Sequence, residues 1–362
     1  MRAAVLSEFG APLSIQTLPD PEVGTGEVVV DIIAAGVGGY AADVFSGARG
    51  YLLELPVVPG PGGIGRIRAT SPDSTRLTPG DWVYCDATIR GRDNIAEPDM
   101  ILLGWTGRTP SALPLHRYFH HGSFAEQVLM PTENVTPIGE INPTDAGRWS
   151  VMGRLLVPYG GLLAGGLHAG QTLVINGATG GFGSAGVTVA LAMGAGRVVA
   201  TGRNTETLQA LADCHRSRVA PVQMTGDPTV DHDRIIEAAG GPVDCVLDLL
   251  PRMATAEQVL TAAMTVRPGG TIVLMGGVGR TGSDELALPY RWLVRNDVTV
   301  RGKWMYPRTA IPQMVQLIRS GLIDLSQFDT TEFALENIND ALPYAKSHSQ
   351  PHQLTVIRPD RE

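Results

Sequence analysis

The sequence has few cysteines and no excess of basic charge, and each shortage excludes a class of protein. Its 362 residues include three cysteines, Cys85, Cys214 and Cys245, which are too scattered for a disulfide framework or a four-cysteine zinc site. The formal net charge is −8 at pH 7. Because phosphate contacts need a concentrated basic face, we expect no nucleic-acid partner.

Long hydrophobic runs are also missing. No stretch approaches the roughly 20 apolar residues that a membrane-spanning helix requires. The first residues, Met1–Val5, lead directly into a strand-like pattern rather than into the apolar region of a signal peptide. We therefore expect a cytoplasmic protein with no membrane partner.

The composition that remains is that of an ordinary globular protein, with 43% hydrophobic and 18% charged residues. A chain of this length is too long for one compact core, so two domains are predicted. Many of the 44 glycines stand in short runs beside apolar segments. That pattern fits an α/β fold with tight turns between strands and helices.

The first part of the chain has the pattern of an antiparallel β domain. Strand-like runs at 28–33, 64–69 and 82–85 are separated by turns rich in glycine and proline. From about residue 86 to residue 121 the periodicity is lost. We interpret this segment as a long surface lobe of the kind that often borders a binding site.

The pattern changes near Arg154, where strands begin to alternate with helices. Such alternation predicts a parallel, doubly wound sheet. The strand-like segments are 172–176, 197–201, 243–248 and 271–275. Beyond Trp304 the pattern changes again, to a helix at 310–319 and a closing strand at 354–357.

The most specific motif is the glycine-rich segment 177–186, which ends a predicted strand and opens a helix. Glycines let the backbone approach a pyrophosphate, and the helix N-terminus presents N–H groups and partial positive charge to it. We predict a dinucleotide site here; a glycine-rich turn without a ligand is the alternative. The predicted cofactor-binding residues of the turn are Gly177, Ala178, Thr179, Gly180, Gly181, Phe182 and Gly183.

The end of the second strand indicates which dinucleotide binds. Sites for NAD place an acidic residue about 20 residues beyond the turn, to hold the ribose 2′-hydroxyl. This chain has Gly202, Arg203 and Asn204 instead. Glycine leaves room for a 2′-phosphate and Arg203 can pair with it bidentately, which favours NADP(H). Alternatively, Arg203 is an exposed loop residue and both cofactors are accepted.

Seven short segments, among them the glycine-rich turn, follow one another along the chain in an order that resembles the medium-chain dehydrogenase/reductase superfamily. This superfamily contains zinc alcohol dehydrogenases and zinc-free quinone oxidoreductases. The resemblance covers nearly the whole chain. The matching segments are Met1–Val5, Gly26–Val28, Ala34–Val37, Pro56–Gly60, Pro79–Val83, Gly122–Glu126 and the glycine-rich turn.

The resemblance implies a GroES-like β-barrel catalytic domain over 1–153, a Rossmann cofactor domain over 154–304, and a return to the catalytic domain over 305–362. It also implies a homodimer and a small-molecule substrate bound in the cleft between the two domains.

The chain departs from the family pattern where the zinc members hold their catalytic metal. Those members carry a cysteine, a Gly-His-Glu triplet and a further cysteine or equivalent. The corresponding positions here are Gly38, Pro61, Gly62 and approximately Gly153. A catalytic zinc needs about three side-chain ligands, and these residues offer none. We therefore predict that this chain is one of the zinc-free members and works without the metal.

The remaining metal candidates in the sequence are weak. Cys85 stands alone in its region, so the structural zinc lobe of the family is missing as well. His116, His120 and His121 lie in the 86–121 segment without cysteine partners, and surface histidines are the ordinary interpretation.

Without zinc, hydride transfer depends on positioning, hydrogen bonding and the reactivity of the acceptor. By the resemblance, Tyr40 takes the hydroxyl position of the zinc members' proton relay and Asp43 its outer end. Tyr40 can donate a proton or a hydrogen bond to a developing oxyanion, or it fills the space that the metal vacated. Asp43 is alternatively a surface or helix-cap residue.

Further residues are predicted around the substrate and the nicotinamide. Arg154 can bind an anionic substrate group or a cofactor phosphate, or form a structural salt bridge. Trp304 lines the substrate pocket or packs between domains. By the resemblance, the backbone of Lys303 and Met305 contacts the carboxamide, and the segment after the strand at 271–275 runs close to the nicotinamide ribose. The residues of that segment are Gly276, Gly277 and Val278.

These patterns lead to three functional hypotheses. The first is an NADPH-dependent, zinc-independent reductase of a quinone or an α,β-unsaturated carbonyl. The second is an NADPH-dependent reductase of an aldehyde, ketone or imine in a biosynthetic pathway. The third is a structural or regulatory protein that binds NADPH and has lost its chemistry.

Overall fold

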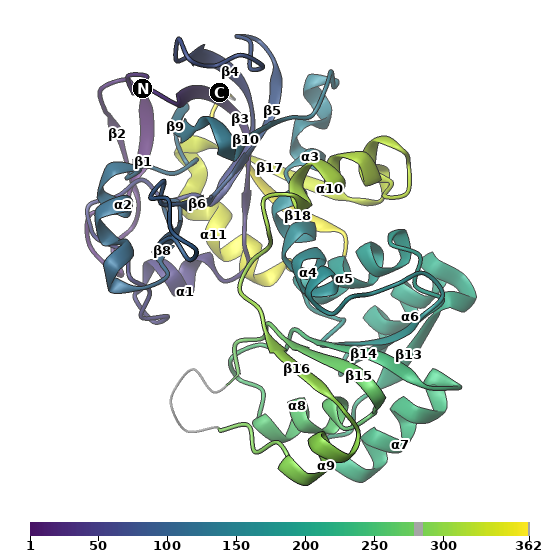
Figure 1. The fold of residues 1–362 in the computed structure, drawn as a ribbon. Coiled ribbons are helices and arrows are strands. Elements are labelled where there is room, and N and C mark those ends of the chain that lie inside the picture. Colours follow the sequence, from purple (N-terminus) through teal and green to yellow (C-terminus); the bar gives the residue numbers. More distant parts are fainter. Residues whose placement is uncertain (279–284, 361–362) are drawn as a thin grey trace. The chain divides into compact units, whose positions relative to one another are not determined.

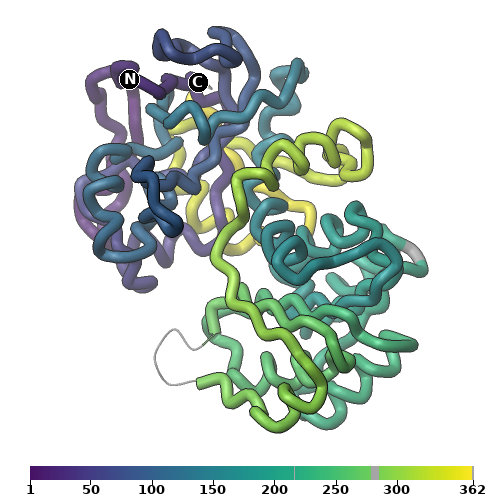
Figure 2. Tube along the Cα trace, in the orientation of Figure 1, coloured from purple at the N-terminus to yellow at the C-terminus, as the bar shows by residue number. Residues whose placement is uncertain are grey.

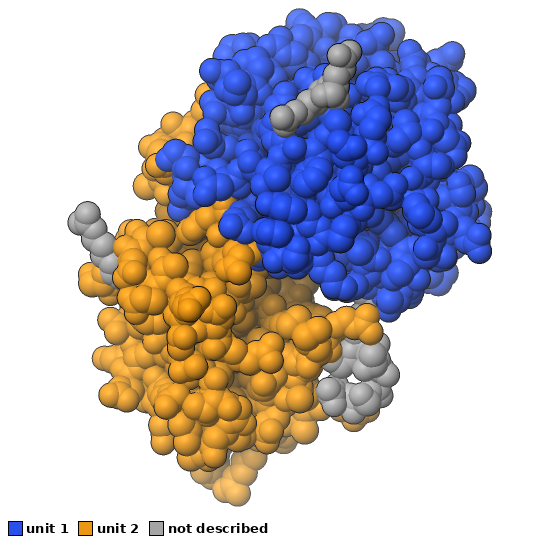
Figure 3. All heavy atoms as spheres, turned by 180° about the vertical axis from the view of Figure 1, so that it is seen from behind, with its two compact units in different colours: residues 1–153, 325–349, 353–362 blue, residues 154–324, 350–352 orange. Residues whose placement is uncertain are grey.

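The computed structural model describes residues 1–278 and 285–360, and the chain divides into two compact units. Unit 1 comprises Met1–Gly153, Leu325–Ser349 and Gln353–Glu362. Unit 2 comprises Arg154–Asp324 and Gln350–His352, and Figure 3 colours the two separately. Figure 2 traces the chain from one end to the other.

Unit 1 is built on a seven-stranded sheet. Its strands are β3 (Glu27–Val37), β4 (Gly62–Thr70), β5 (Trp82–Asp86), β9 (Gln127–Pro131), β10 (Val135–Pro137), β17 (Asp329–Ala334) and β18 (Gln353–Arg358). The order is β10-β5-β4-β3-β18-β17, with β9 also paired to β3, and only β17 and β18 run parallel. Val28, Val29 and Val30 of β3 are all at most 2% exposed, so both faces of this central strand are covered.

The smaller elements of unit 1 include the segment 86–121. They are β1 (Arg2–Val5), β2 (Ser14–Thr17), β6 (Thr88–Arg90), β7 (Met100–Leu102), β8 (Thr106–Gly107), α1 (Ala41–Phe45), α2 (Leu113–Tyr118), α3 (Ala146–Trp149) and α11 (Ile338–Ser347). Ile101, Leu103 and Trp105 are at most 1% exposed. The prediction of a surface lobe is therefore wrong for this part of the segment, because its strands are too short for their periodicity to be visible.

Unit 2 contains a parallel sheet of six strands in the order β13-β12-β11-β14-β15-β16. Strands β13, β14, β15 and β16 are labelled in Figure 1. The strands are β11 (Thr172–Asn176), β12 (Arg197–Gly202), β13 (Val219–Gln223), β14 (Val243–Asp248), β15 (Val266–Leu274) and β16 (Thr299–Gly302). The chain winds outward first on one side of β11 and then on the other, which confirms the predicted doubly wound sheet. In this arrangement ligands bind where the strand order reverses, at the carboxyl ends of β11 and β14.

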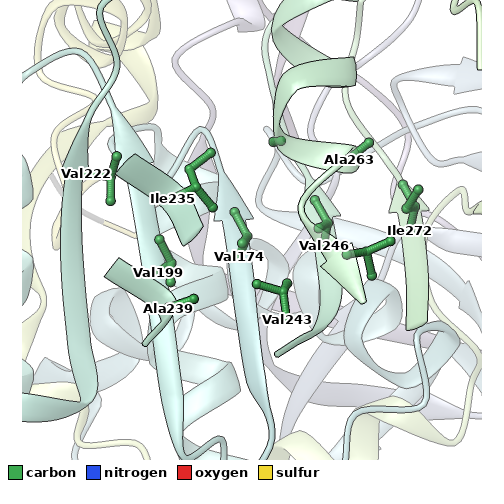
Figure 4. Close-up of a cluster of buried hydrophobic side chains, with 11 residues drawn as sticks. Val174, Val199, Val222, Ile235, Ala239, Val243, Val246, Ala263 and Ile272 are labelled. Carbon is green, nitrogen blue, oxygen red and sulfur yellow. The ribbon is translucent and has the colours of Figure 1, made fainter. Parts of the chain in front are cut away.

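Helices cover both faces of this sheet. They are α4 (Met152–Ala164), α5 (Gly181–Ala192), α6 (Thr205–His215), α7 (Pro228–Ala239), α8 (Ala256–Ala263) and α9 (Tyr290–Arg295), and a further helix of unit 2 is α10 (Ala310–Arg319). On one face, Val174 and Val246 pack with Ile235 of α7 and Ala263 of α8 in a buried apolar cluster (Figure 4). Alternate strand residues point to the other face, where Leu247 contacts α4.

Unit 2 extends beyond residue 304, where a return to the catalytic domain was predicted. Residues 305–324 belong to unit 2 because α10 packs on α4, and Tyr159 Oη donates a hydrogen bond of 2.9 Å to Gln313 Oε1. One face of α10 is buried, through Ala310, Ile311, Met314, Val315 and Ile318.

Among the described residues, none of the helices combines the length and the apolar character that crossing a bilayer requires.

Candidate functional site

The glycine-rich turn of unit 2 has the shape that a cofactor diphosphate requires. Gly177 follows β11 with a φ of +88°, which glycine adopts at no steric cost. A β-carbon added at Gly183 would overlap the carbonyl oxygen of Gly177, so the turn and α5 approach too closely for any side chain. Gly180 precedes α5 and provides no side-chain cap for its N-terminus. The N–H groups of the first turn thus fit an anion.

A buried network of polar side chains lies below the turn. Asn176 Nδ2 donates to Asp248 Oδ1 at 2.9 Å, and Thr201 Oγ1 donates to Asn176 Oδ1 at 2.8 Å. The Gly177 amide donates in turn to Thr201 Oγ1 at 3.3 Å. Burial raises the pKa of Asp248 to about 7, against the opposing effect of the Asn176 hydrogen bond. The network ties the ends of β12, β11 and β14 to the first residue of the turn.

Sequence reasoning missed these three residues, although a signal was present. Each is a polar residue at or next to the end of an apolar strand. Asn176 is the direct register partner of both Thr201 and Asp248, which is why the three side chains meet.

The predicted segment Gly276–Val278 lies beside Asp248. A β-carbon added at Gly276 would lie 2.5 Å from Asp248 Oδ2, so this position excludes side chains. The Gly277 amide is already used, since it donates to the carbonyl oxygen of Leu250 at 2.9 Å. A cavity of about 160 Å³ adjoins this segment and is lined by Asp248, Ala256, Val259, Leu274, Gly276, Val278 and Leu286.

At the end of β12, the three predicted residues have different environments. Arg203 is exposed, and within the described part of the chain no hydrogen bond or ion pair holds its guanidinium. A β-carbon at Gly202 would overlap Thr179, so the space beside this glycine accommodates Thr179 rather than standing open for a phosphate. Asn204 Oδ1 accepts from the Thr207 amide at 3.0 Å and caps α6.

Arg154 lies next to the glycine-rich turn. Its Cζ and Nε atoms are 3.6 Å from the position that a β-carbon of Gly181 would take. Burial lowers the pKa of the Arg154 guanidinium to about 10, so it remains charged at neutral pH. The structure therefore brings Arg154 to the first residue of α5.

The segment after β16 offers fewer backbone groups than predicted. The Lys303 amide donates to the carbonyl oxygen of Leu274 at 3.0 Å, so this amide is already used inside unit 2. Met305 has a φ of +58°, and its carbonyl packs closely against Gly160 of α4. Trp304 is 36% exposed, which leaves its indole accessible to a ligand.

Tyr40 and Asp43 belong to unit 1, at the start of α1. The Tyr40 ring meets Trp105 edge-on at 5.7 Å between centroids, and the Arg49 guanidinium lies 4.5 Å above the Tyr40 ring. Burial raises the pKa of Tyr40 far above its ordinary value, so its phenol stays protonated. The Asp43 carboxylate instead accepts from Lys346 Nζ of α11 at 3.2 Å.

The positions aligned with the zinc ligands do not fit the metal. A β-carbon at Gly38 would lie 3.2 Å from Tyr40 Cε1, and one at Gly62 would overlap the Cys85 carbonyl oxygen. Neither position therefore holds a side-chain donor, and at Gly62 the backbone leaves no space for one. Within 1–278 and 285–360, no three His, Cys, Asp or Glu side chains are grouped as a metal site would need.

The three histidines of the 86–121 segment pack against one another in unit 1. His116 is fully buried, with its ring centroid 5.8 Å from that of His120, and His121 Nδ1 accepts from the Val58 amide at 3.4 Å. Burial lowers the pKa of both His116 and His121 to about 4, so these two rings are neutral at physiological pH.

Comparison with known proteins identifies relatives of both units. The family described as alcohol dehydrogenase GroES-like domain matches residues 24–140, and that described as zinc-binding dehydrogenase matches residues 181–320. An alcohol dehydrogenase of Geobacillus stearothermophilus is 28% identical and covers 94% of both chains. A sorbitol dehydrogenase of Bacillus subtilis (strain 168) is 24% identical over 100% of this chain and 98% of its own.

Solved structures show the same fold. A thermostable alcohol dehydrogenase from Pyrobaculum aerophilum superimposes with a TM-score of 0.76 at 20% identity, covering 99% of each chain. The predicted combination of a GroES-like domain and a Rossmann domain is confirmed. With most of its length matched by these two families, the protein is an oxidoreductase of the medium-chain dehydrogenase/reductase superfamily.

Proposed function

We propose that the protein is an NADP(H)-dependent, zinc-independent reductase whose acceptor is a quinone or an α,β-unsaturated carbonyl. The preference for NADP(H) depends on Arg203, an exposed cation at the end of β12, where sites for NAD carry an acidic residue. The glycine-rich turn and the N-terminus of α5 would hold the diphosphate. When bound, the cofactor supplies or accepts a hydride.

Independence from zinc is supported by the residues at the aligned ligand positions. Gly38 and Gly62 provide no donor atom, and the Tyr40 ring packs over Gly38. Without a Lewis acid, an acceptor must already be electron-poor, as quinones and enones are. The contribution of this chain would then be a hydrogen bond from the neutral Tyr40 hydroxyl to the acceptor oxygen that gains negative charge.

A second candidate is the reduction of an aldehyde or ketone, or the reverse oxidation of an alcohol. The names of both curated relatives, an alcohol dehydrogenase and a sorbitol dehydrogenase, favour it. A small-molecule substrate and a homodimer are proposed on the family resemblance alone.

The experiment is an acceptor panel. The purified protein would be assayed for NADPH and NADH oxidation with quinones, enones and aldehydes, before and after dialysis against a chelator, and its zinc content measured. We expect turnover of quinones or enones with NADPH that survives chelation. Turnover that needs stoichiometric zinc would refute zinc independence. Tight NADPH binding with no turnover of any acceptor would support the third hypothesis, a protein that binds the cofactor without chemistry.

A further inference from the structure

We propose that Trp105 is a positioning residue for Tyr40, and that its indole N–H supports the Tyr40 oxygen while the Tyr40 hydroxyl donates to the acceptor. This inference rests on the proposed function, because it requires that Tyr40 takes part in the reaction. It brings a residue of segment 86–121 into the chemistry of the site, although Trp105 itself need not touch the substrate.

Tyr40 is held from several directions within unit 1. Its carbonyl oxygen accepts from the Asp43 amide at 3.1 Å, at the start of α1. Gly38 lies close to one edge of the ring, since a β-carbon there would be 3.2 Å from Tyr40 Cε1. The Arg49 guanidinium lies 4.5 Å from the ring centroid, over its face, and the Trp105 ring meets it edge-on with an interplanar angle of 89°. These contacts fix the orientation of the ring and therefore the place of its hydroxyl.

Trp105 is itself placed by a tight turn between β7 and β8. Its amide donates to the carbonyl oxygen of Leu102 at 2.9 Å, and Gly104 before it has a φ of +60°, a conformation that favours glycine. The indole packs against Tyr40 and against Phe45, whose ring centroid is 5.3 Å away, at the two ends of α1. Trp105 is 1% exposed, so the turn presents a rigid, buried ring to Tyr40.

The indole N–H of Trp105 is a buried donor that makes no hydrogen bond. Within residues 1–278 and 285–360, Trp105 Nε1 has no hydrogen-bond partner, which is unfavourable for a buried polar group. Burial raises the pKa of the Tyr40 hydroxyl, whereas Arg49 and Trp105 both lower it, Trp105 in the role of a hydrogen-bond donor. The N–H therefore lies near the Tyr40 oxygen without forming a well-aligned hydrogen bond to it.

The reaction provides this N–H with a partner. When Tyr40 donates to an acceptor oxygen that gains negative charge, the Tyr40 oxygen becomes more negative as well. An N–H beside that oxygen then forms a stronger hydrogen bond than in the resting protein, because catalytic hydrogen bonds often tighten only at this stage. An indole N–H can only donate, so it occupies a lone pair of the Tyr40 oxygen and leaves the phenolic proton for the acceptor. Trp105 would thus lower the barrier through Tyr40.

A double-mutant cycle tests this coupling. The full-length protein, Trp105→Phe, Tyr40→Phe and the double variant would be assayed with NADPH and the best acceptor of the quinone and enone panel. We expect Trp105→Phe to lower kcat about 3-fold to 10-fold with the acceptor KM unchanged, as for loss of one hydrogen bond that forms in the transition state. In the Tyr40→Phe background the same substitution should not lower kcat further, because the oxygen that the N–H supports is gone.

Trp82 provides the matched control. It is 2% exposed, its Nε1 also has no hydrogen-bond partner among the described residues, and the Arg66 guanidinium lies 4.4 Å from its ring centroid. Trp82→Phe therefore removes the same volume and the same kind of N–H from β5, and it should leave kcat unchanged. If Trp105→Phe fails to fold, as judged by its thermal melt, the test uses replacement of Trp105 by β-(3-benzothienyl)alanine. This residue keeps the shape of the indole and has sulfur in place of the N–H, so the same loss of kcat is expected.

The outcomes distinguish this inference from the proposed function. If the unmodified protein turns over no acceptor, the proposed function is overturned and the inference with it. If Tyr40→Phe lowers kcat but the change at Trp105 does not, only the inference is overturned. An equal loss of kcat in both Tyr40 backgrounds would also overturn it, because Trp105 would then act on the fold and not through the Tyr40 oxygen.

Discussion

Replacing Arg203 by alanine should change the cofactor preference of the protein. The Arg203 guanidinium is exposed and is held by no ion pair in the described part of the chain, so its removal leaves no buried charge behind. A hydrogen bond to a charged group contributes about 1.5–3 kcal/mol, and solvent exposure favours the lower end of that range. We therefore expect the Kd for NADPH to rise about 10-fold and the Kd for NADH to stay constant.

The assay is the change in protein fluorescence on titration with each cofactor, at low and at high salt. Because the site is exposed, the effect of the substitution should shrink as salt screens the 2′-phosphate. Arg203→Glu is the complementary variant: it places an acidic residue where sites for NAD carry one and should bring the preference toward NADH. Equal weakening of both cofactors by Arg203→Ala, at any salt concentration, would refute the assignment of the 2′-phosphate to this side chain.

Three other predictions concern the turn, the buried carboxyl and the tyrosine. Gly183→Ala forces a β-carbon into the Gly177 carbonyl, so it should lower the stability measured in thermal melts by about 1–3 kcal/mol and abolish NADPH binding. Gly241→Ala is the control: its β-carbon would meet no atom within 4 Å, so it should change neither stability nor binding. Burial raises the pKa of Asp248 in the folded protein from 3.8 to about 7, so between these pH values ionisation of Asp248 favours the unfolded chain. The free energy of unfolding of Asp248→Asn, relative to that of the unmodified protein, should therefore increase as the pH rises from about 4 to about 7. A difference between the two proteins that does not change with pH would contradict this prediction. Tyr40→Phe should lower kcat on the order of 10²-fold where chemistry limits turnover, and an unchanged kcat would assign Tyr40 to packing alone.

The parallel sheet of unit 2 and its glycine-rich turn were predictable because their signals are local. A strand, a turn rich in glycine and a helix follow one another within segment 172–192, and this order predicts a site for a dinucleotide. Segment 86–121 was not predictable in this way. Its strands have two or three residues each, too few for the alternation of buried and exposed positions to show in the sequence.

The contacts around the turn depend on tertiary register, which the sequence does not display. Asn176 meets Thr201 and Asp248 only because β11 lies between β12 and β14, and the strand order does not follow from the strands themselves. The position of Arg154 depends in the same way on how α4 packs along α5. For these residues the sequence provides the chemistry of the side chain, and the packing decides where it acts.

Several glycines in both units mark points where another part of the chain approaches closely, and only the structure shows which part. At Gly183 a β-carbon would overlap the Gly177 carbonyl oxygen, and Gly177 has a φ of +88°, so both glycines let the turn pack closely on α5. A β-carbon at Gly62 would overlap the Cys85 carbonyl oxygen, and one at Gly38 would make a tight contact of 3.2 Å with the Tyr40 ring. Restoring a cysteine at Gly38 would therefore place its β-carbon against Tyr40 before it could reach a metal ion. Such a cysteine would also leave Gly62 without a donor atom, so we expect that this single substitution does not confer zinc binding.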